Sequence, residues 1–186
     1  MDRPEGNPMA DAVDTFFQRW LEASNAGDWD RLGDMMRPEV VLTDPMAAEP
    51  AVGRDAVLAR ARAQYAPFPD GVVTMVGEPL TSVDRRSIAY RWHFTGRQDR
   101  EVKPPGFAAT GRRVELDGAS FIELVEGRAS RISMFYDSTT VARQLLAAPS
   151  AGSPLERLVV VAQRARVAVE RARVAVGRAR AGRRRS

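Results

Sequence analysis

Two carboxylates of this sequence stand where an apolar segment meets a turn. Asp44 follows the apolar residues 40–42 and Thr43 and precedes Pro45, and Asp137 follows the mainly apolar segment "ISMFY" at 132–136. Proline keeps the residue before it extended, so Asp44 is expected to enter the interior of the fold. Apolar surroundings raise the pKa of a carboxylate, because they disfavour its charged form. Such a carboxylate can therefore act as a base and as an acid near neutral pH. Asp44 and Asp137 are therefore candidate acid/base groups.

Each carboxylate also has a purely structural interpretation. Asp44 could accept backbone N–H bonds in an Asp-Pro turn. Asp137 precedes the segment "STTVARQL", where it could cap the first turn of a helix. The sequence leaves both interpretations open.

The segment "YRWHF" places further chemistry on one strand. Arg91 and His93 are two residues apart and share one face, whereas Tyr90, Trp92 and Phe94 share the other. Arg91 and His93 are candidate catalytic residues that would orient or polarise a substrate oxygen. A face with three aromatic residues is usually buried, so the sequence does not decide which face lines a cavity.

A further set of residues would line a substrate pocket. Most of its members are large and apolar, which is typical of a site for a hydrophobic ligand. The candidates are Phe16, Trp20, Met46, Trp92, Asp117 and Met134.

Composition excludes several other classes of site. Cysteine is absent and His93 is the single histidine, so a thiolate nucleophile, a disulfide framework and a multi-histidine zinc site are ruled out. The segment "GRDAV" around Gly53 lacks a phosphate-loop pattern. We expect neither a metal nor a cofactor.

The N-terminus has no basic segment followed by an apolar core, and nowhere do roughly 18 apolar residues run together. The sequence thus predicts no membrane span and a cytoplasmic location.

The basic charge is confined to the C-terminal end. Residues 155–186 contain ten arginines and two glutamates, whereas the rest of the chain has 18 basic and 22 acidic residues. This end repeats a seven-residue pattern that would give a helix a thin alanine seam. Alanine buries little area and the arginines do not gather on one face, so we expect a solvated tail without a specific nucleic-acid partner. An arm that binds nucleic acid or an anionic surface is the alternative.

The order of the predicted elements indicates the fold class. Helical patterns come first, and four segments rich in β-branched and aromatic residues follow, separated by Gly, Asp or Pro turns. We expect an α+β fold in which a curved antiparallel sheet carries helices on its concave face and forms a cone with a central pocket. The predicted organisation is a disordered N-terminus at 1–9, the cone domain at 10–147, and a linker with the basic tail at 148–186.

Three segments carry a resemblance to known families. Residues 18–57, with the turn "DPMAAEP", resemble the first third of ketosteroid isomerases. The segments "ATGRRVELDGASFIEL" and "FYDSTTVARQLL" resemble SnoaL-like polyketide cyclases, and "YRWHF" is similar to the Arg-x-Asp pair of limonene epoxide hydrolases. All three groups share the nuclear transport factor two-like cone, and the resemblance covers roughly residues 10–147.

The resemblance implies roles for particular residues. The isomerase match makes Asp44 the general base, and the cyclase match makes Asp137 the acid/base group. The epoxide-hydrolase match directs Arg91 into the pocket and puts His93 where that family has an acid. Trp20 stands where isomerases have an oxyanion tyrosine, which is a departure from the isomerase pattern.

The resemblance also implies a function. It indicates a cofactor-free enzyme, and a homodimer, that performs cyclisation, isomerisation or epoxide opening on a hydrophobic polyketide-, terpenoid- or steroid-like molecule. The alternative is a non-catalytic ligand-binding or assembly module of the same fold with an Arg-rich docking tail. If Asp44 and Asp137 share one closed cavity, the enzyme is favoured; if either points to solvent, the binding module gains.

Overall fold

The computed structural model describes residues 8–84, 86–103 and 106–183. Residues 1–7, most of the N-terminal segment that the sequence predicts to be disordered, lie outside the described residues. The chain divides into two compact units, Met1–Ala147 and Ala148–Ser186. The first unit holds a sheet with helices, and the second holds one long helix, α5 (Pro154–Arg183).

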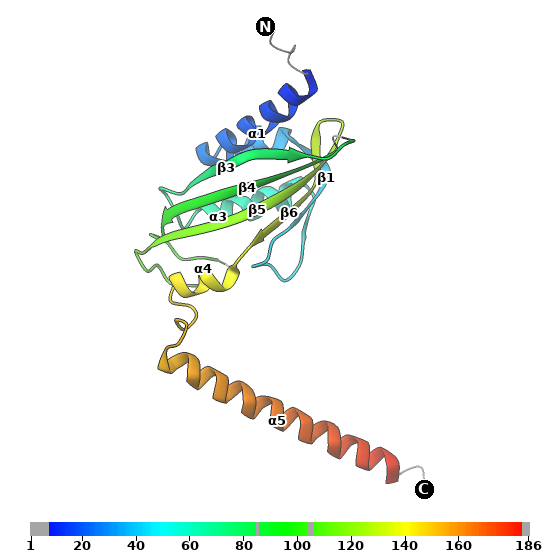
Figure 1. The fold of residues 1–186 in the computed structure, drawn as a ribbon, viewed down its shortest axis with the longest axis vertical. Helices are drawn as coiled ribbons and strands as arrows, with labels where there is room; N and C mark the ends of the chain where they lie inside the picture. Colours follow the sequence, from blue (N-terminus) through cyan, green and yellow to red (C-terminus); the bar gives the residue numbers. More distant parts are fainter. Residues whose placement is uncertain (1–7, 85, 104–105, 184–186) are drawn as a thin grey trace, which may run out of the picture. The chain divides into compact units, whose positions relative to one another are not determined.

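Six strands form a single open sheet in the order β2-β1-β6-β5-β4-β3 (Figure 1). Their bounds are β1 (Met36–Thr43), β2 (Ala51–Val52), β3 (Val72–Thr81), β4 (Ser87–Arg97), β5 (Arg113–Val125) and β6 (Arg128–Tyr136). The pairs from β6 to β3 are antiparallel, as the sequence predicts. Strand β1 lies parallel to β6, although almost 90 residues separate them in the chain. The sheet is therefore mixed.

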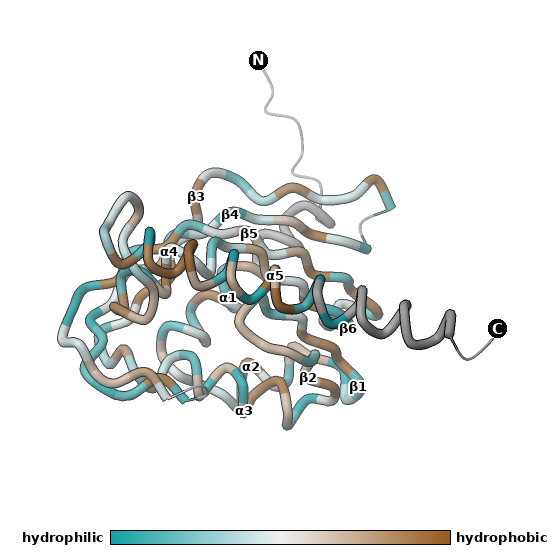
Figure 2. Tube along the Cα trace, turned by 90° about the horizontal axis from the view of Figure 1, so that it is seen from below, coloured by the Kyte–Doolittle hydropathy of each residue, from teal (hydrophilic) through white to brown (hydrophobic). Residues whose placement is uncertain are grey.

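Four helices accompany the sheet in the first unit: α1 (Pro8–Ala26), α2 (Trp29–Asp34), α3 (Arg54–Tyr65) and α4 (Ser138–Gln144). Helix α1 is followed by Gly27, whose φ of +65° suits a glycine just after a helix C-terminus. The Asp28 carboxylate accepts the Arg31 N–H at 3.1 Å and caps α2. Figure 2 shows α2 and α3 on one side of the molecule and strands β3 to β5 on the other. The predicted α+β cone is confirmed.

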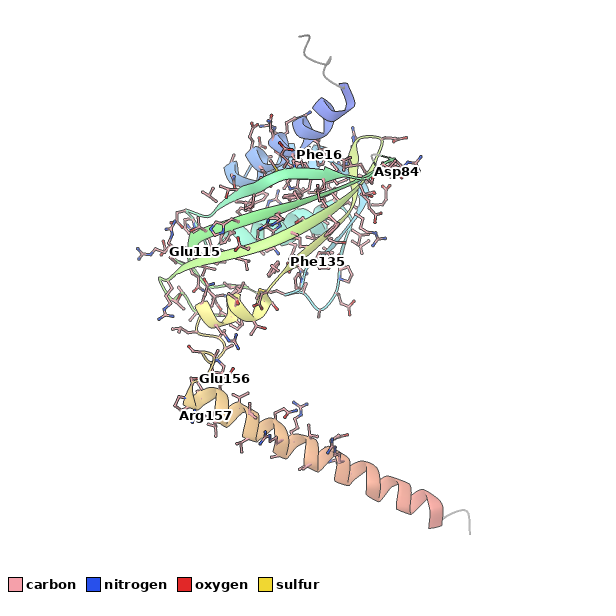
Figure 3. All side chains as sticks on the ribbon, in the orientation of Figure 1. Phe16, Asp84, Glu115, Phe135, Glu156 and Arg157 are labelled. Carbon is pink, nitrogen blue, oxygen red and sulfur yellow. The ribbon has the colours of Figure 1, made fainter. Side chains whose placement is uncertain are left out.

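Strict alternation along the strands decides which side chains face the helices. In β4, Ile88, Tyr90 and Trp92 are buried, and in β5 Ser120 and Ile122 are buried. The side chains between them point to the outer face of the sheet. Figure 3 shows Phe135 on the sheet, with Asp84 at the β3–β4 turn and Glu115 toward the other end of β5.

The connection between β4 and β5 is fastened by Gln98, which is completely buried. Its amide group donates to the Ala108 carbonyl at 3.0 Å and accepts from the Thr110 N–H at 3.1 Å and the Thr110 hydroxyl at 2.7 Å. Val102 in the same connection reaches the interior beside α4. One end of the cone is thus closed by a loop with its own polar anchor.

The described side chains of α5 are mostly exposed, including Leu158, Val161 and Val169. In contrast, all the buried hydrophobic side chains that the structure describes lie between Phe16 and Leu145. The expected nucleic-acid independence of the tail and the expected homodimer stay predictions. No helix of the described chain is long and apolar enough to cross a membrane.

We predict that a chain truncated after Ala147 keeps its fold, because the described core is complete without α5. Thermal unfolding of the full-length and truncated proteins should differ by less than about 4 °C, which corresponds to roughly 1 kcal/mol for a domain of this size. A loss of about 10 °C or more would show that α5 contributes to the packed core.

Candidate functional site

A cavity of about 200 Å³ lies between the concave face of the sheet and the helices. It is called the central cavity below. Its wall is mainly apolar, with side chains from α1, α2, α3 and α4 and from strands β1, β3, β4, β5 and β6. The polar side-chain groups in the wall are carried by eight residues: Trp20, Ser24, Gln64, Tyr65, Tyr90, Trp92, Ser120 and Tyr136.

Asp44 is buried next to this cavity, with 8% of its surface exposed. Its carboxylate accepts the Tyr136 hydroxyl at 2.6 Å, the Met46 N–H at 2.9 Å and the Gln64 amide. The side chains of all three partners line the central cavity. Asp44 therefore lies directly behind the cavity wall, and the Tyr136 hydroxyl contacts its carboxylate.

The Asp44 interactions explain its place in the sequence. Pro45 ends the strand, and the Asp44 carbonyl and carboxylate accept the N–H groups of Ala47 and Met46 in the turn that follows. The turn chemistry and the inward direction of the carboxylate are thus both present. A buried carboxylate with neutral donors only is costly to maintain, which is the usual mark of a functional group.

The Tyr136 hydroxyl is held in its neutral form. Burial, the hydrogen bond to Asp44 and the negative charge of Asp44 all raise the pKa of Tyr136 far above its ordinary value. The charge of Arg60 acts in the opposite direction and is a smaller effect. Tyr136 therefore offers the cavity a protonated hydroxyl whose own proton is already directed at a carboxylate.

The floor of the cavity depends on a glycine. A Cβ atom on Gly118 would lie 2.2 Å from Cζ2 of Trp92, so the indole can lie over β5 only because this position has no side chain. There the Trp92 indole N–H donates to the Ser120 hydroxyl at 2.9 Å. The Trp92 and Tyr136 rings meet edge to face, with centroids 6.0 Å apart. Trp92 thus connects the floor to the Asp44 side of the cavity.

The structure separates the other predicted carboxylate from this site. Asp137 is exposed and caps α4, accepting the N–H groups of Thr139 and Thr140 at 2.8 and 3.1 Å. The hydroxyl and N–H of Thr140 lower the pKa of Asp137, so it is ionised in water. The hypothesis that Asp44 and Asp137 face one cavity is corrected, because the helix cap directs Asp137 outward.

Arg91 and His93 also lie outside the cavity. Both belong to the outer face of β4, where His93 Nδ1 is 2.9 Å from the carboxylate of Asp117. Asp117 has an exposed side chain and is not a pocket residue, contrary to the sequence-based expectation. Successive residues of a strand point to opposite faces, so the aromatic residues that alternate with Arg91 and His93 face inward and line the cavity.

The predicted pocket residues fall into two groups. Trp20, Met46, Trp92 and Met134 line the cavity. Phe16 lies in the core behind it and stacks on Trp20 with ring centroids 5.7 Å apart. Phe16 thus supports the wall without forming part of it.

Sequence reasoning missed the partners of Asp44. Gln64 follows Val57 and Ala61 at helical spacing, so it shares their inward face of α3. Tyr136 continues the inward alternation of Ile132 and Met134 along β6. The periodic patterns could have placed both residues in the cavity, but not beside Asp44.

We predict that Gly118→Ala disrupts the cavity floor, because the added methyl group would overlap the Trp92 indole. Overpacking of this kind typically costs about 1–3 kcal/mol. Urea unfolding should show the loss, and the NMR signal of the Trp92 indole N–H should move as its bond to Ser120 breaks. Ala119→Ser, on the outer face of the same strand, is the control. Equal stability of the two variants would contradict the assigned fit.

The tyrosines generate a pH prediction. The chain has three tyrosines, and burial is the main cause that raises the pKa of each: Tyr65 to about 12, and Tyr90 and Tyr136 further. An unfolded tyrosine ionises near pH 10. The stability gained from the neutral phenols is therefore complete below about pH 10 and is lost between about pH 10 and 12 as the unfolded chain ionises first.

An ultraviolet titration tests this expectation. The folded protein should show almost no tyrosinate absorbance at pH 10.5. This pH is about half a unit above the ordinary tyrosine pKa, so the tyrosines of the protein in denaturant should be largely ionised there. Substantial tyrosinate in the folded protein at that pH would mean that at least one phenol is open to water.

Among the described residues, no group of three or more His, Asp or Glu side chains is arranged to hold a metal ion. The polar side-chain groups of the central cavity are hydroxyls, two indole N–H groups and one amide, with the Asp44 carboxylate behind them. This set can donate hydrogen bonds and transfer protons.

Known proteins share this architecture. A protein described as a SnoaL-like polyketide cyclase, from Jannaschia Sp. CCS1, superposes with a TM-score of 0.66 at 18% identity, over 81% of this chain and 99% of its own. IdmH, described as a polyketide cyclase from Streptomyces antibioticus, has a TM-score of 0.58 at 23% identity, over 71% and 96%. A protein described as a ketosteroid isomerase, from Kribbella flavida DSM 17836, has a TM-score of 0.51 at 20% identity, over 77% and 82%. At these identities the likeness shows the fold.

Among curated proteins, none matches this sequence. The family profile of the SnoaL-like domain matches residues 17–132, which include Asp44, Trp92 and Ser120. This match spans more than half of the chain and agrees with the cone architecture and with the superfamily that the sequence resembles. The chain belongs to the SnoaL-like family.

Proposed function

We propose that the protein binds a compact hydrophobic molecule in the central cavity and exchanges a proton with it through Tyr136 and Asp44. The observation that carries the proposal is the Asp44 carboxylate, which is buried behind the cavity wall and held by three neutral donors. Neither turn geometry nor packing requires the Tyr136 hydroxyl to be directed at a carboxylate inside an apolar wall.

The geometry supports a relay of the proton. The Tyr136 hydroxyl donates to Asp44, and Tyr136 lines the cavity, so its phenol oxygen can act as a hydrogen-bond acceptor for a ligand. A proton that leaves the ligand can bond to this oxygen while the original hydroxyl proton moves to Asp44. The reverse movement returns a proton to another atom of the ligand. Tyr136 is thus the group that touches the ligand, and Asp44 is the proton acceptor behind it.

The cavity favours a small ring system. Its volume of about 200 Å³ is below the roughly 300–1,000 Å³ that is common for ligand sites. Its aromatic floor and apolar wall favour a flat, uncharged molecule. Neighbours described as polyketide cyclases and as a ketosteroid isomerase support acid/base chemistry on such rings. We propose a two-ring substrate of polyketide or terpenoid type in preference to a four-ring steroid.

The exposed position of Asp137 favours the second candidate, a binding module without catalysis. The catalytic proposal therefore depends on Asp44 alone among the carboxylates, and on Tyr136. An assay of proton removal can separate the two functions before the natural substrate is known.

We predict that the protein accelerates the base-catalysed opening of 5-nitrobenzisoxazole, a flat two-ring probe. The base removes the ring C–H proton, the N–O bond breaks, and the electrons end on the oxygen of a coloured nitrile-phenolate. Asp44→Asn should lower the rate by at least about 10²-fold, because a general base typically contributes 10²- to 10⁴-fold. Tyr136→Phe should also lower it, since the relay loses its first oxygen.

Asp137→Asn is the matched control. Asparagine still accepts hydrogen bonds at a helix N-cap, so this variant should keep the rate and the stability of the parent protein. If the probe binds but opens no faster than in buffer, the protein is a binding module. If Asp44→Asn loses the rate and Tyr136→Phe keeps it, Asp44 acts directly and the relay is wrong.

A further inference from the structure

A second polar site lies on the floor of the central cavity, separate from Asp44. Tyr90 and Ser120 are paired residues on neighbouring strands β4 and β5, and both line the cavity. Their exposed fractions are only 8% and 2%. Two hydroxyls so deeply buried in a mostly apolar wall need partners for their hydrogen atoms.

The partners of these hydroxyls can be followed one by one. The Trp92 indole N–H donates to the Ser120 hydroxyl at 2.9 Å. The side chains of Ser120 and Trp20 lie next to the Tyr90 hydroxyl, where hydrogen bonding to them partly offsets the increase in the Tyr90 pKa that burial causes. The four groups therefore form a chain in the order Trp20, Tyr90, Ser120, Trp92, with three contacts between neighbours.

The number of hydrogen atoms exceeds the number of contacts. Each indole carries one N–H and cannot accept, and each hydroxyl carries one O–H, so the chain holds four hydrogens for three contacts. If Tyr90 donates to Ser120, the Ser120 hydrogen is unused; if Ser120 donates to Tyr90, the Tyr90 hydrogen is unused. Within the described chain neither hydroxyl donates to any other group. One O–H on the cavity floor thus has no acceptor in the protein.

The remaining hydroxyl hydrogen is kept in place over a wide pH range. Burial raises the pKa of Tyr90 well above its ordinary value, so the phenol does not ionise in neutral solution. The indoles fix the positions of both oxygens, since each ring is packed in the core. The floor therefore presents a preorganised donor.

We propose that Tyr90 and Ser120 form an oxygen site that binds the carbonyl, or another neutral acceptor oxygen, of a fused-ring ligand. The inference rests on the proposed function only in that the central cavity binds a small molecule. A neutral acceptor fits because the site has one donor to spare and no cation faces it from the cavity wall of the described chain. An apolar ligand would leave that hydrogen without a partner, at a cost of about 1–3 kcal/mol.

Trp92 decides how the ligand lies. Its indole N–H points to Ser120, and its ring is 6.0 Å from that of Tyr136 between centroids. A molecule that touches both the oxygen site and Tyr136 must therefore extend along the Trp92 indole. This favours a rigid aromatic framework with the acceptor oxygen at one end and the acidic hydrogen at the other.

The test compares two probes of the same shape. 2-Acetylnaphthalene carries a carbonyl, and 2-isopropenylnaphthalene has a methylene group in its place. The parent protein should bind the ketone at least as tightly as the alkene, and the carbonyl stretching frequency of the bound ketone should be lower than in hexane. A cavity without a free donor would prefer the alkene, because the ketone would lose its bond to water on entry.

The variant must remove both hydroxyls, because either one alone retains the spare hydrogen. In the double variant Tyr90→Phe/Ser120→Ala binding of the ketone should weaken roughly 2- to 12-fold relative to binding of the alkene, which is the range for one hydrogen bond. The Trp20 and Trp92 indole N–H groups lose their acceptors in this variant, but both rings are packed in the core and aim their N–H groups at the lost oxygens and not at the ligand. The carbonyl stretching frequency of the bound ketone should rise toward its value in hexane. The alkene makes no such bond, so its unchanged affinity shows that the cavity is intact.

Two further variants locate the site. Asp137→Asn, at the exposed cap of α4, should leave the ketone preference and the carbonyl frequency unchanged. If the frequency shift vanishes in Tyr136→Phe, the carbonyl binds at the Asp44 side and the inference is wrong. It is also wrong if the parent protein prefers the alkene, or if the double variant weakens both probes equally.

Failure of the oxygen site can be distinguished from failure of the proposed function. If neither naphthalene binds to the parent protein, small-molecule binding itself fails, and with it the proposed function. If the ketone binds as described but the nitrobenzisoxazole is not opened, the oxygen site stands in a protein that binds without catalysing.

Discussion

The Asp44 carboxylate has lost most of its contact with water, so its position depends on the donors that surround it. Those donors come from three places: the turn after β1, helix α3 and the end of β6. The same turn and α3 form one wall of the central cavity. The parallel pairing of β1 with β6 brings Asp44 and Tyr136 together across 92 residues of sequence. The hydrogen bonds to this one carboxylate therefore hold the cavity wall together and position the candidate acid/base pair, Asp44 and Tyr136.

The cavity floor is organised by a complementary constraint, the fit of Trp92 over Gly118. Because the indole lies across β5, its N–H reaches Ser120 and its ring reaches Tyr136. One aromatic side chain thus separates two polar sites of different character. At one site a carboxylate accepts a hydroxyl proton, and at the other a hydroxyl proton has no acceptor. An apolar cavity with one proton acceptor and one donor favours an uncharged ligand that has an oxygen at one end.

The outer face of the sheet has a different role from the cavity. Arg91, His93 and Asp117 lie there, next to the exposed rings of Phe121 and Phe135, whose centroids are 5.6 Å apart. Three residues that the sequence marks as candidates for chemistry are thus surface residues. The contact between His93 and Asp117 is open to water, where such contacts contribute little to stability. Chemistry-bearing residue types alone do not identify a site; the face on which they lie decides.

The sequence by itself determined the order of helices and strands, the α+β class, and the unusual position of Asp44, because hydrophobic periodicity and the Asp-Pro turn are local properties. It also placed Trp20, Met46, Trp92 and Met134 near a pocket. It could not determine which face of β4 is inside, since both alternating sets have a plausible role. Only the tertiary structure turned Asp137 outward as a helix cap and joined Asp44 to Gln64 and Tyr136. Those contacts join distant segments through the pairing of β1 with β6, and no local pattern encodes that pairing.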